Sequence, residues 1–165
     1  MKVDISKISG YKSDYLSFGF KEEDYVFTEI EIVENKILAK FDLTDCFVSH
    51  ENEFHFTVPL AFRIISQLAI IFTCVERNYD KKPGEVYLRD IYLKSKKHIK
   101  KVSGLEIVLE IKKVIIKDDY FYYSGDINIE NGAFWGEGSL IIPKMQNEGA
   151  TKNQYESEFN NIKNS

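Results

Sequence analysis

The longest apolar stretch of the sequence lies near its middle and constrains the fold more than any other feature. After Pro59 the chain stays apolar for about four helical turns, and residues 64–75 carry no charge. Apolar side chains point in nearly every direction around such a helix, so the rest of the protein must enclose it. The charge-free run is shorter than the roughly 20 residues that a membrane-spanning helix needs. The stretch therefore predicts one buried helix and no insertion into a membrane.

Strand patterns lie on both sides of this helix. Residues 26–44 alternate apolar and polar around the turn-like Glu34-Asn35-Lys36, which predicts two strands or one bent long strand. Beyond a predicted turn at 80–84, four strand-like runs follow, at residues 85–95, 104–117, 120–129 and 132–143. Asn131-Gly132 is a strong signal for a two-residue hairpin turn, and Lys117-Asp118-Asp119 predicts another tight connection. We expect these four strands to be consecutive antiparallel neighbours.

The order of these elements predicts an α+β domain in which a strongly curved antiparallel sheet wraps around one long buried helix. That arrangement is the hotdog fold. The competing fold is a cone-shaped α+β domain of the ketosteroid-isomerase type, which normally begins with helices. We expect an irregular N-terminal arm at 1–24, the hotdog domain at 25–145 and a disordered tail at 146–165, which is too polar to offset its ordering entropy. Exposed sheet edges predict a homodimer or a dimer of dimers.

Composition excludes several classes of function. A net charge of −4 gives no support to a nucleic-acid partner. The N-terminus lacks the apolar region of a secretory signal, which favours a cytoplasmic protein. Cys46 and Cys74 are isolated, so we expect buried free thiols, with a disulfide or a nucleophile as the alternatives. The three histidines do not have the spacing of a zinc site, and we expect neither a metal nor a cofactor.

The start of the buried helix is the predicted site. The first N–H groups of a helix lack internal partners and the helix dipole makes that end partly positive, so a thioester carbonyl placed there is polarised. Polar side chains near this end are His55, Thr57, Arg63, Ser66 and Gln67. Arg63 needs a partner when buried. It either pairs with an acidic residue of the preceding loop (Asp45, Glu51 or Glu53) or meets a carboxylate or phosphate of a ligand.

Several short motifs resemble those of the FcoT-like long-chain fatty acyl-CoA thioesterases, which are hotdog proteins. These motifs are His55-Phe56-Thr57, Phe62–Gln67, the basic run Leu93–Ile99 and Phe134–Gly138. The resemblance implies hydrolysis of an acyl-CoA or acyl-carrier-protein thioester. It implies that Thr57, Ser66 and Gln67 position water and that His55 assists. Thr57, Arg63 and Ser66 stand about where the family has asparagines.

His55-Phe56 also resembles the His-Phe pair of the 3-hydroxyacyl-carrier-protein dehydratases. In those enzymes a carboxylate one and a half turns into the helix acts as the acid, but Ser66 or Gln67 stands there in this sequence. Dehydration would need an acid from elsewhere, such as Asp45 or Glu53. A non-catalytic acyl-thioester-binding protein is the other alternative.

The only dense cationic run of the chain is expected to bind the carrier of the acyl group. It contains five lysines, namely Lys94, Lys96, Lys97, Lys100 and Lys101. Lys94, Lys96 and Lys97, together with Arg63, are predicted to capture coenzyme A phosphates or an acidic acyl-carrier protein. The alternative is a solvated strand end and turn.

Overall fold

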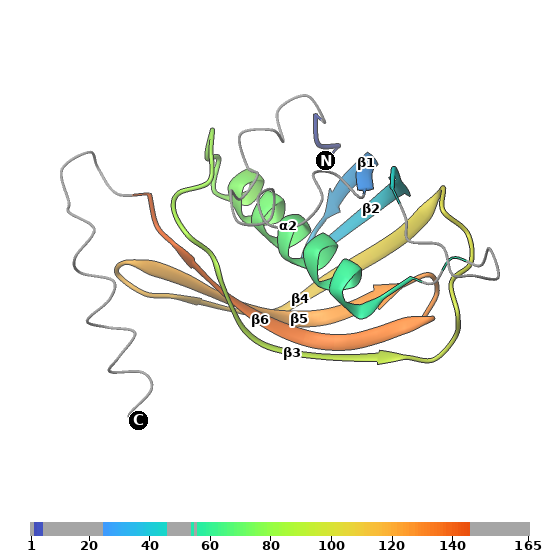
Figure 1. Cartoon of the computed structure of the whole chain (residues 1–165). Coiled ribbons are helices and arrows are strands. Elements are labelled where there is room, and N and C mark those ends of the chain that lie inside the picture. Colours follow the sequence, from blue (N-terminus) through green and yellow to red (C-terminus); the bar gives the residue numbers. More distant parts are fainter. Residues whose placement is uncertain (1, 5–24, 46–53, 55, 146–165) are drawn as a thin grey trace.

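The structure is a computed structural model and describes residues 2–4, 25–45, 54 and 56–145. A six-stranded antiparallel sheet curves around one helix, labelled α2 (Figure 1). The strands are β1 (Tyr25–Val33), β2 (Lys36–Leu43), β3 (Tyr87–Ser95), β4 (Leu105–Ile116), β5 (Tyr120–Ile129) and β6 (Phe134–Pro143). The tail predicted at 146–165, and all of the arm predicted at 1–24 except residues 2–4, lie outside the described residues.

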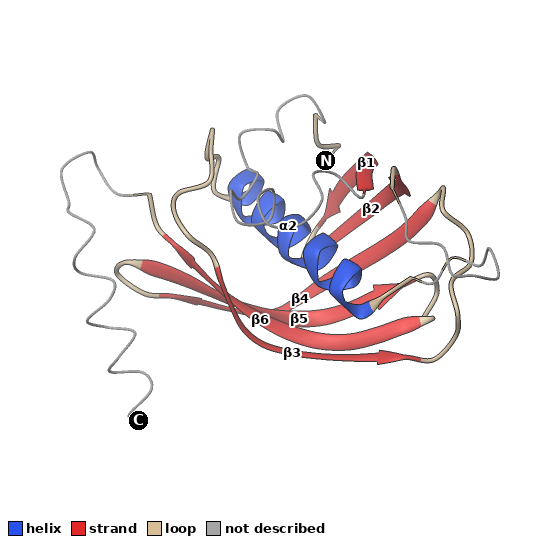
Figure 2. Cartoon of the chain, viewed as in Figure 1, coloured by secondary structure: helices blue, strands red, loops and turns tan. Residues whose placement is uncertain are grey.

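Helix α2 (Val58–Glu76) is 19 residues long and lies on the concave side of the sheet (Figure 2). Its first residue, Val58, precedes Pro59, its last is Glu76, and Arg77 is the C-cap residue. Asn78, which follows the cap, has a positive φ of 55°. Every residue from Arg63 to Cys74 is buried. By length and composition alone the helix would be able to cross a membrane, but most of it is buried inside the structure, as in the core helix of a folded domain. The predicted buried helix is confirmed.

The strand order across the sheet is β1-β2-β4-β5-β6-β3. The last three strands form the predicted meander, since β4 pairs with β5 and β5 with β6. The prediction that β3 is the neighbour of β4 is wrong, because β3 pairs with β6 at the sheet edge and β4 pairs with β2. Residues 96–104 therefore cross the end of the sheet from its edge to its middle. A curved sheet of this order around one enclosed helix is the hotdog fold.

Three turns link sequence to register. Val33 pairs with Lys36, so Glu34 and Asn35 form a two-residue hairpin turn and Glu34 has a φ of 54°. The tight connection at 117–119 is confirmed by the bond from Lys117 N to Tyr120 O, 3.0 Å. The hairpin at Asn131-Gly132 also exists, but it has four residues between paired Ile129 and Phe134 rather than two. Glu130, Asn131 and Gly132 all have positive φ.

Sheet curvature has identifiable causes in the strands. The register shifts at three β-bulges, between Phe27 and Glu29 in β1, Leu88 and Asp90 in β3, and Ile111 and Lys113 in β4. Bulges bend a strand and increase its twist. Gly136 of β6 lies so close to β3 that a Cβ there would overlap the carbonyl oxygen of Tyr92. A glycine at this position lets the edge strand approach and pair.

The burial of α2 can be tested by truncating one of its core side chains. Leu68 is fully buried between the helix and the sheet, and truncating such a side chain removes its transfer free energy and leaves a cavity. We expect Leu68→Ala to lower the free energy of unfolding by about 2–5 kcal/mol. Val114→Ala, at a side chain 40% exposed, serves as the control and should change it by less than about 0.5 kcal/mol. Urea denaturation measures both, and equal effects would contradict the buried position of α2.

Candidate functional site

The start of α2 is exposed and capped by its own sequence. Thr57 is the N-cap residue with extended backbone, and its Oγ1 accepts a bond of 3.4 Å from the N–H of Leu60. Pro59 has no N–H to offer. The first turn therefore presents fewer free donors than helix starts usually do. The N–H of Val58, whose side chain is 38% exposed, belongs to this end.

Aromatic packing fixes the segment that leads into the helix. Phe56 is buried, and its ring centroid lies 6.2 Å from that of Phe41 and 5.2 Å from that of Phe134. Phe54 is also buried. These contacts hold the start of α2 against β2 and the first residue of β6. His55, between the two phenylalanines, lies outside the described residues, as do His50, Glu51 and Glu53.

Three predicted site residues lie close together on α2. Arg63, Ser66 and Gln67 are each 7% exposed. At 3.6 residues per turn Arg63 and Gln67 are on the opposite side of the helix from Ile65 and Ala69, which line a cavity against the sheet, and Ser66 is on the flank between the two sides. The structure thus brings Arg63, Ser66 and Gln67 to one part of the helix, with Thr57 at its N-terminal end. Among the residues that the structure describes, these four are the candidates for a site at this helix.

Arg63 is in contact with β1. Its Cζ lies 5.9 Å from the ring centroid of Tyr25, and the hydroxyl of Tyr25 donates a bond of 3.4 Å to its backbone carbonyl oxygen. Asp45, one of the three acidic residues considered as its partner, is exposed. The guanidinium therefore combines deep burial with an aromatic neighbour.

The lysine cluster is at the same end of the molecule as the helix start but on the other side of the sheet. Lys94 is registered with Trp135, which is exposed, whereas the preceding residue Phe134 is buried and contacts Phe56. Lys96 and Lys97 donate their backbone N–H groups to the Ala133 carbonyl oxygen. The structure does not bring these lysines next to Thr57.

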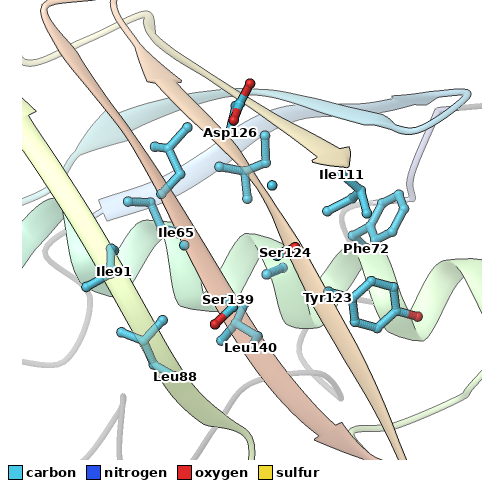
Figure 3. A pocket seen from close by; sticks show the side chains of 15 residues that line it. Ile65, Phe72, Leu88, Ile91, Ile111, Tyr123, Ser124, Asp126, Ser139 and Leu140 are labelled. Carbon is cyan, nitrogen blue, oxygen red and sulfur yellow. The ribbon is translucent and has the colours of Figure 1, made fainter. Parts of the chain in front are cut away.

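A small apolar cavity of about 30 Å³ lies between α2 and the sheet. In Figure 3, Leu88 and Ile91 of β3 lie at one side of it and Phe72 and Tyr123 at the other. Small residues of β5 and β6 form its floor, because Gly125 pairs with Gly138 and Ser124 with Ser139.

Two polar groups around this cavity are engaged in other contacts. Ser139 Oγ donates a bond of 2.9 Å to Asp90 Oδ2. Asp126 Oδ2 lies 3.5 Å from Lys112 Nζ. Sequence patterns did not single out Asp126 or the serines; the only available signal was the run of small residues within two strands. Their contacts make Ser139 and Asp126 structural residues of the sheet rather than reactive groups.

Tyr123 joins the cavity wall to the end of α2. Its hydroxyl donates a bond of 3.0 Å to Glu76 Oε2 and accepts one of 3.3 Å from Arg77 Nε. Burial raises the pKa of Tyr123 to about 12. Burial likewise raises the pKa of the Cys74 thiol to about 12, and this free, buried thiol confirms the prediction for Cys74. Cys46 lies outside the described residues.

Metal binding has no basis in the part of the chain that the structure describes. No group of three or more histidine, cysteine, aspartate or glutamate residues there is arranged to hold an ion. His98 is exposed on the 96–104 connection.

Comparison with known proteins gives similarity at the level of structure only. No family model and no curated protein matches the chain. A mutant thioesterase from Pseudomonas aeruginosa is similar with a TM-score of 0.48, 13% identity, and coverage of 86% of this chain and 96% of that one. A hypothetical thioesterase from Streptococcus pneumoniae, solved with coenzyme A, has a TM-score of 0.49 and 9% identity, with coverage of 87% of this chain and 100% of that one. The dehydratase heterocomplex ApeI:P from Xenorhabdus doucetiae has a TM-score of 0.46 and 12% identity, with coverage of 96% of this chain and 98% of that one. The fold assignment rests on the strand order and the enclosed helix rather than on these similarities.

The N-cap gives a direct test of the helix start. Thr57→Ala removes the oxygen that accepts from Leu60 N, and loss of a capping oxygen typically costs about 1 kcal/mol. Thr57→Ser keeps the oxygen and should stay within about 0.5 kcal/mol of the parent protein. Urea denaturation distinguishes the two variants. Equal stability of the alanine and serine variants would contradict the capping role.

The raised pKa of Tyr123 predicts that the protein loses stability at alkaline pH. An unfolded tyrosine titrates at about pH 10, so the folded state holds this proton more tightly than the unfolded state. The stability that the neutral phenol contributes is complete below about pH 10 and is lost as pH rises toward 12. Tyr123→Phe should therefore lose stability less steeply over that interval in urea denaturation at constant ionic strength. Identical slopes for the two proteins would show that the phenol is not buried.

Proposed function

We propose that this protein binds an acyl thioester at the start of α2 and hydrolyses it to a carboxylic acid and a thiol. The observation that carries the proposal is the position of Ser66 and Gln67. Both are buried polar side chains on a largely apolar helix that begins at the exposed, Thr57-capped end. Hydroxyl and amide side chains can each donate and accept hydrogen bonds, so these two groups are able to hold a water and a thioester carbonyl.

The mechanism places the carbonyl oxygen at the positive end of α2. Water attacks the carbonyl carbon, and the oxygen gains negative charge that the helix dipole and the Val58 N–H stabilise. The C–S bond then breaks, the sulfur leaves as a thiolate and takes up the proton that the water has lost. Ser66 and Gln67 lie about 12 Å or more along the helix axis from Val58 of the same copy. In this proposal the Gln67 and Ser66 side chains of the second copy in the dimer therefore hold the water, and His55 receives its proton in transit.

The carrier and the assembly belong to the same proposal. Lys94, Lys96 and Lys97 hold the carrier by its negative charge, whether coenzyme A or an acyl-carrier protein. Two copies pair in a homodimer or further into a dimer of dimers, because β3 ends the sheet with an unpaired edge. A reducing cytoplasm suits the free thiol of Cys74.

A non-catalytic acyl-thioester-binding protein is the second candidate. The capped start of α2 favours it, because the Leu60 N–H is bonded to Thr57 and Pro59 lacks an N–H. A helix start with few free donors stabilises an oxyanion less well. Dehydration has less support, because α2 carries no acidic residue before Glu76 and Asp45 is exposed.

Hydrolysis is tested with purified full-length protein, acyl-coenzyme A of graded chain length and acyl-carrier-protein conjugates, by following free thiol. We expect release above the uncatalysed rate and a reduction of kcat by about 100-fold in Gln67→Ala, because a group that holds the reacting water has been removed. Lys113→Ala, at an exposed residue of β4, is the control and should keep the parent rate.

Two results would count against hydrolysis. Thiol release at the background rate with every substrate, together with retention of the acyl compound in native mass spectrometry, would establish the binding protein instead. A fully active Gln67→Ala protein would remove Gln67 from the mechanism.

A further inference from the structure

Two exposed aromatic rings stand side by side on the outer face of the sheet. Trp135 of β6 is 40% exposed and Tyr92 of β3 is 52% exposed. Their ring centroids are 6.4 Å apart and the rings are nearly perpendicular, at 80°. Together the two rings form a contiguous exposed apolar patch, and such patches often mark binding sites. The rest of the fold leaves this pair open to solvent.

Lysines surround the indole. Lys96 Nζ lies 5.2 Å from the Trp135 ring centroid, and Lys94 is the direct register partner of Trp135 on the neighbouring strand. Within the described residues, no ion pair joins Lys94 or Lys96 to a carboxylate. By contrast, Lys101 Nζ lies 2.9 Å from Glu130 Oε2. Positive charge at the indole is therefore available to a ligand.

We propose that Trp135, Tyr92, Lys94 and Lys96, here called the Trp135 platform, bind the phosphorylated adenine nucleotide of coenzyme A. The purine lies against the indole, since stacking of a base on an aromatic side chain is favourable for any base. The ammonium groups of Lys94 and Lys96 contact the phosphates. The identification of the nucleotide as part of an acyl carrier rests on the proposed function, whereas nucleotide binding itself does not.

The neighbouring row of the sheet favours a nucleotide over an acidic protein. Tyr92 is registered with Glu137, Glu137 with Asp126, and Asp126 with Glu110. This acidic row lies two residues from Trp135 on the same face of the sheet. Two lysines offset part of this row. Lys112 Nζ lies 2.8 Å from Glu110 and 3.5 Å from Asp126, and Lys36 Nζ lies 3.4 Å from Glu110. An acidic protein lying flat on this face would meet those carboxylates, while a nucleotide fits within the lysine row.

The platform lies near the start of α2. Phe134, the residue before Trp135, packs its ring 5.2 Å from that of Phe56 on the inner face. Successive residues of a strand point to opposite faces. Trp135 and the helix start therefore lie at the same end of the sheet and on opposite sides of it. A carrier with a flexible arm between its nucleotide and its sulfur can reach around that end.

The chain supplies its own probe, because Trp135 is its single tryptophan. Fluorescence excited at the indole is followed while coenzyme A, adenosine 3′,5′-bisphosphate, ATP, pantetheine or inorganic phosphate is added. We expect saturable quenching by coenzyme A and by adenosine 3′,5′-bisphosphate, and none by pantetheine or phosphate. Quenching by ATP as strong as by the bisphosphate would assign the platform to adenine nucleotides in general and overturn the coenzyme A proposal.

Charge reversal tests whether Lys94 and Lys96 contact the phosphates. The double variant Lys94→Glu with Lys96→Glu should weaken nucleotide binding by at least about tenfold, because attraction to the phosphates becomes repulsion. Lys113→Glu with Lys117→Glu, at exposed positions of β4 and the turn that follows, makes the same change in net charge and should leave binding unaltered. Equal weakening by both double variants would reduce the effect to net charge, and saturable binding that neither changes would exclude the platform. Circular dichroism confirms that each variant is folded.

The failures of the two proposals can be told apart. Nucleotide quenching without thiol release from acyl-coenzyme A retains the platform and removes hydrolysis. Thiol release from acyl-coenzyme A and acyl-pantetheine with the same KM, and no quenching by any nucleotide, retains hydrolysis and removes the platform. If both proposals hold, Trp135→Ala raises the KM for acyl-coenzyme A about tenfold, because the stacking face is lost, and leaves the KM for acyl-pantetheine unchanged.

Discussion

Burial of α2 against the concave face of the sheet is the interaction on which the rest of this structure depends. The helix has no acidic residue in its first turn and no basic one in its last, so its stability comes from packing rather than from charges at its ends. Each fully buried side chain, such as Leu68, Ile70 or Ile71, contributes about 1.5–3 kcal/mol of transfer free energy. A flat sheet would leave part of this surface in water. The three β-bulges and the close approach at Gly136 let the sheet curve instead.

The enclosure of α2 also decides where chemistry can take place. Its sheet side is apolar and closes on a cavity of about 30 Å³, where Ser139 and Asp126 already have partners. Polar groups remain at the exposed N-terminal end and on the part of the helix that carries Arg63, Ser66 and Gln67. A reacting thioester therefore belongs at that end and beside those groups. The proposed nucleotide platform lies on the other side of the same sheet end, so a single carrier would contact both.

Local sequence patterns predicted the parts of the fold that depend on local physics. The charge-free run at 64–75 predicted α2, and strand-like runs predicted β3 to β6. Alternation at 26–44 predicted two strands or one bent strand, and the structure has two, β1 and β2. The position of β3 could not be predicted, because pairing with β6 depends on contacts between residues far apart in sequence. The two-residue turn predicted at Asn131-Gly132 was wrong because the strands pair only as far as Ile129 and Phe134, and Ala133 N bonds to Glu130 O within the four-residue loop. In the sequence, Trp135 could be identified only as part of a motif. Its exposure depends on which face of the sheet its side chain occupies, and strand register decides that.

The most direct test of the account is amide chemical-shift mapping of the full-length protein with a non-hydrolysable thioether analogue of an acyl-coenzyme A. The account predicts that the largest shifts fall on the backbone N–H of Val58 and the side-chain amide of Gln67. The buried amides of α2 beyond Ile70 should stay unchanged. Shifts confined to other parts of the sheet, with Val58 and Gln67 unaffected by saturating analogue, would contradict the account.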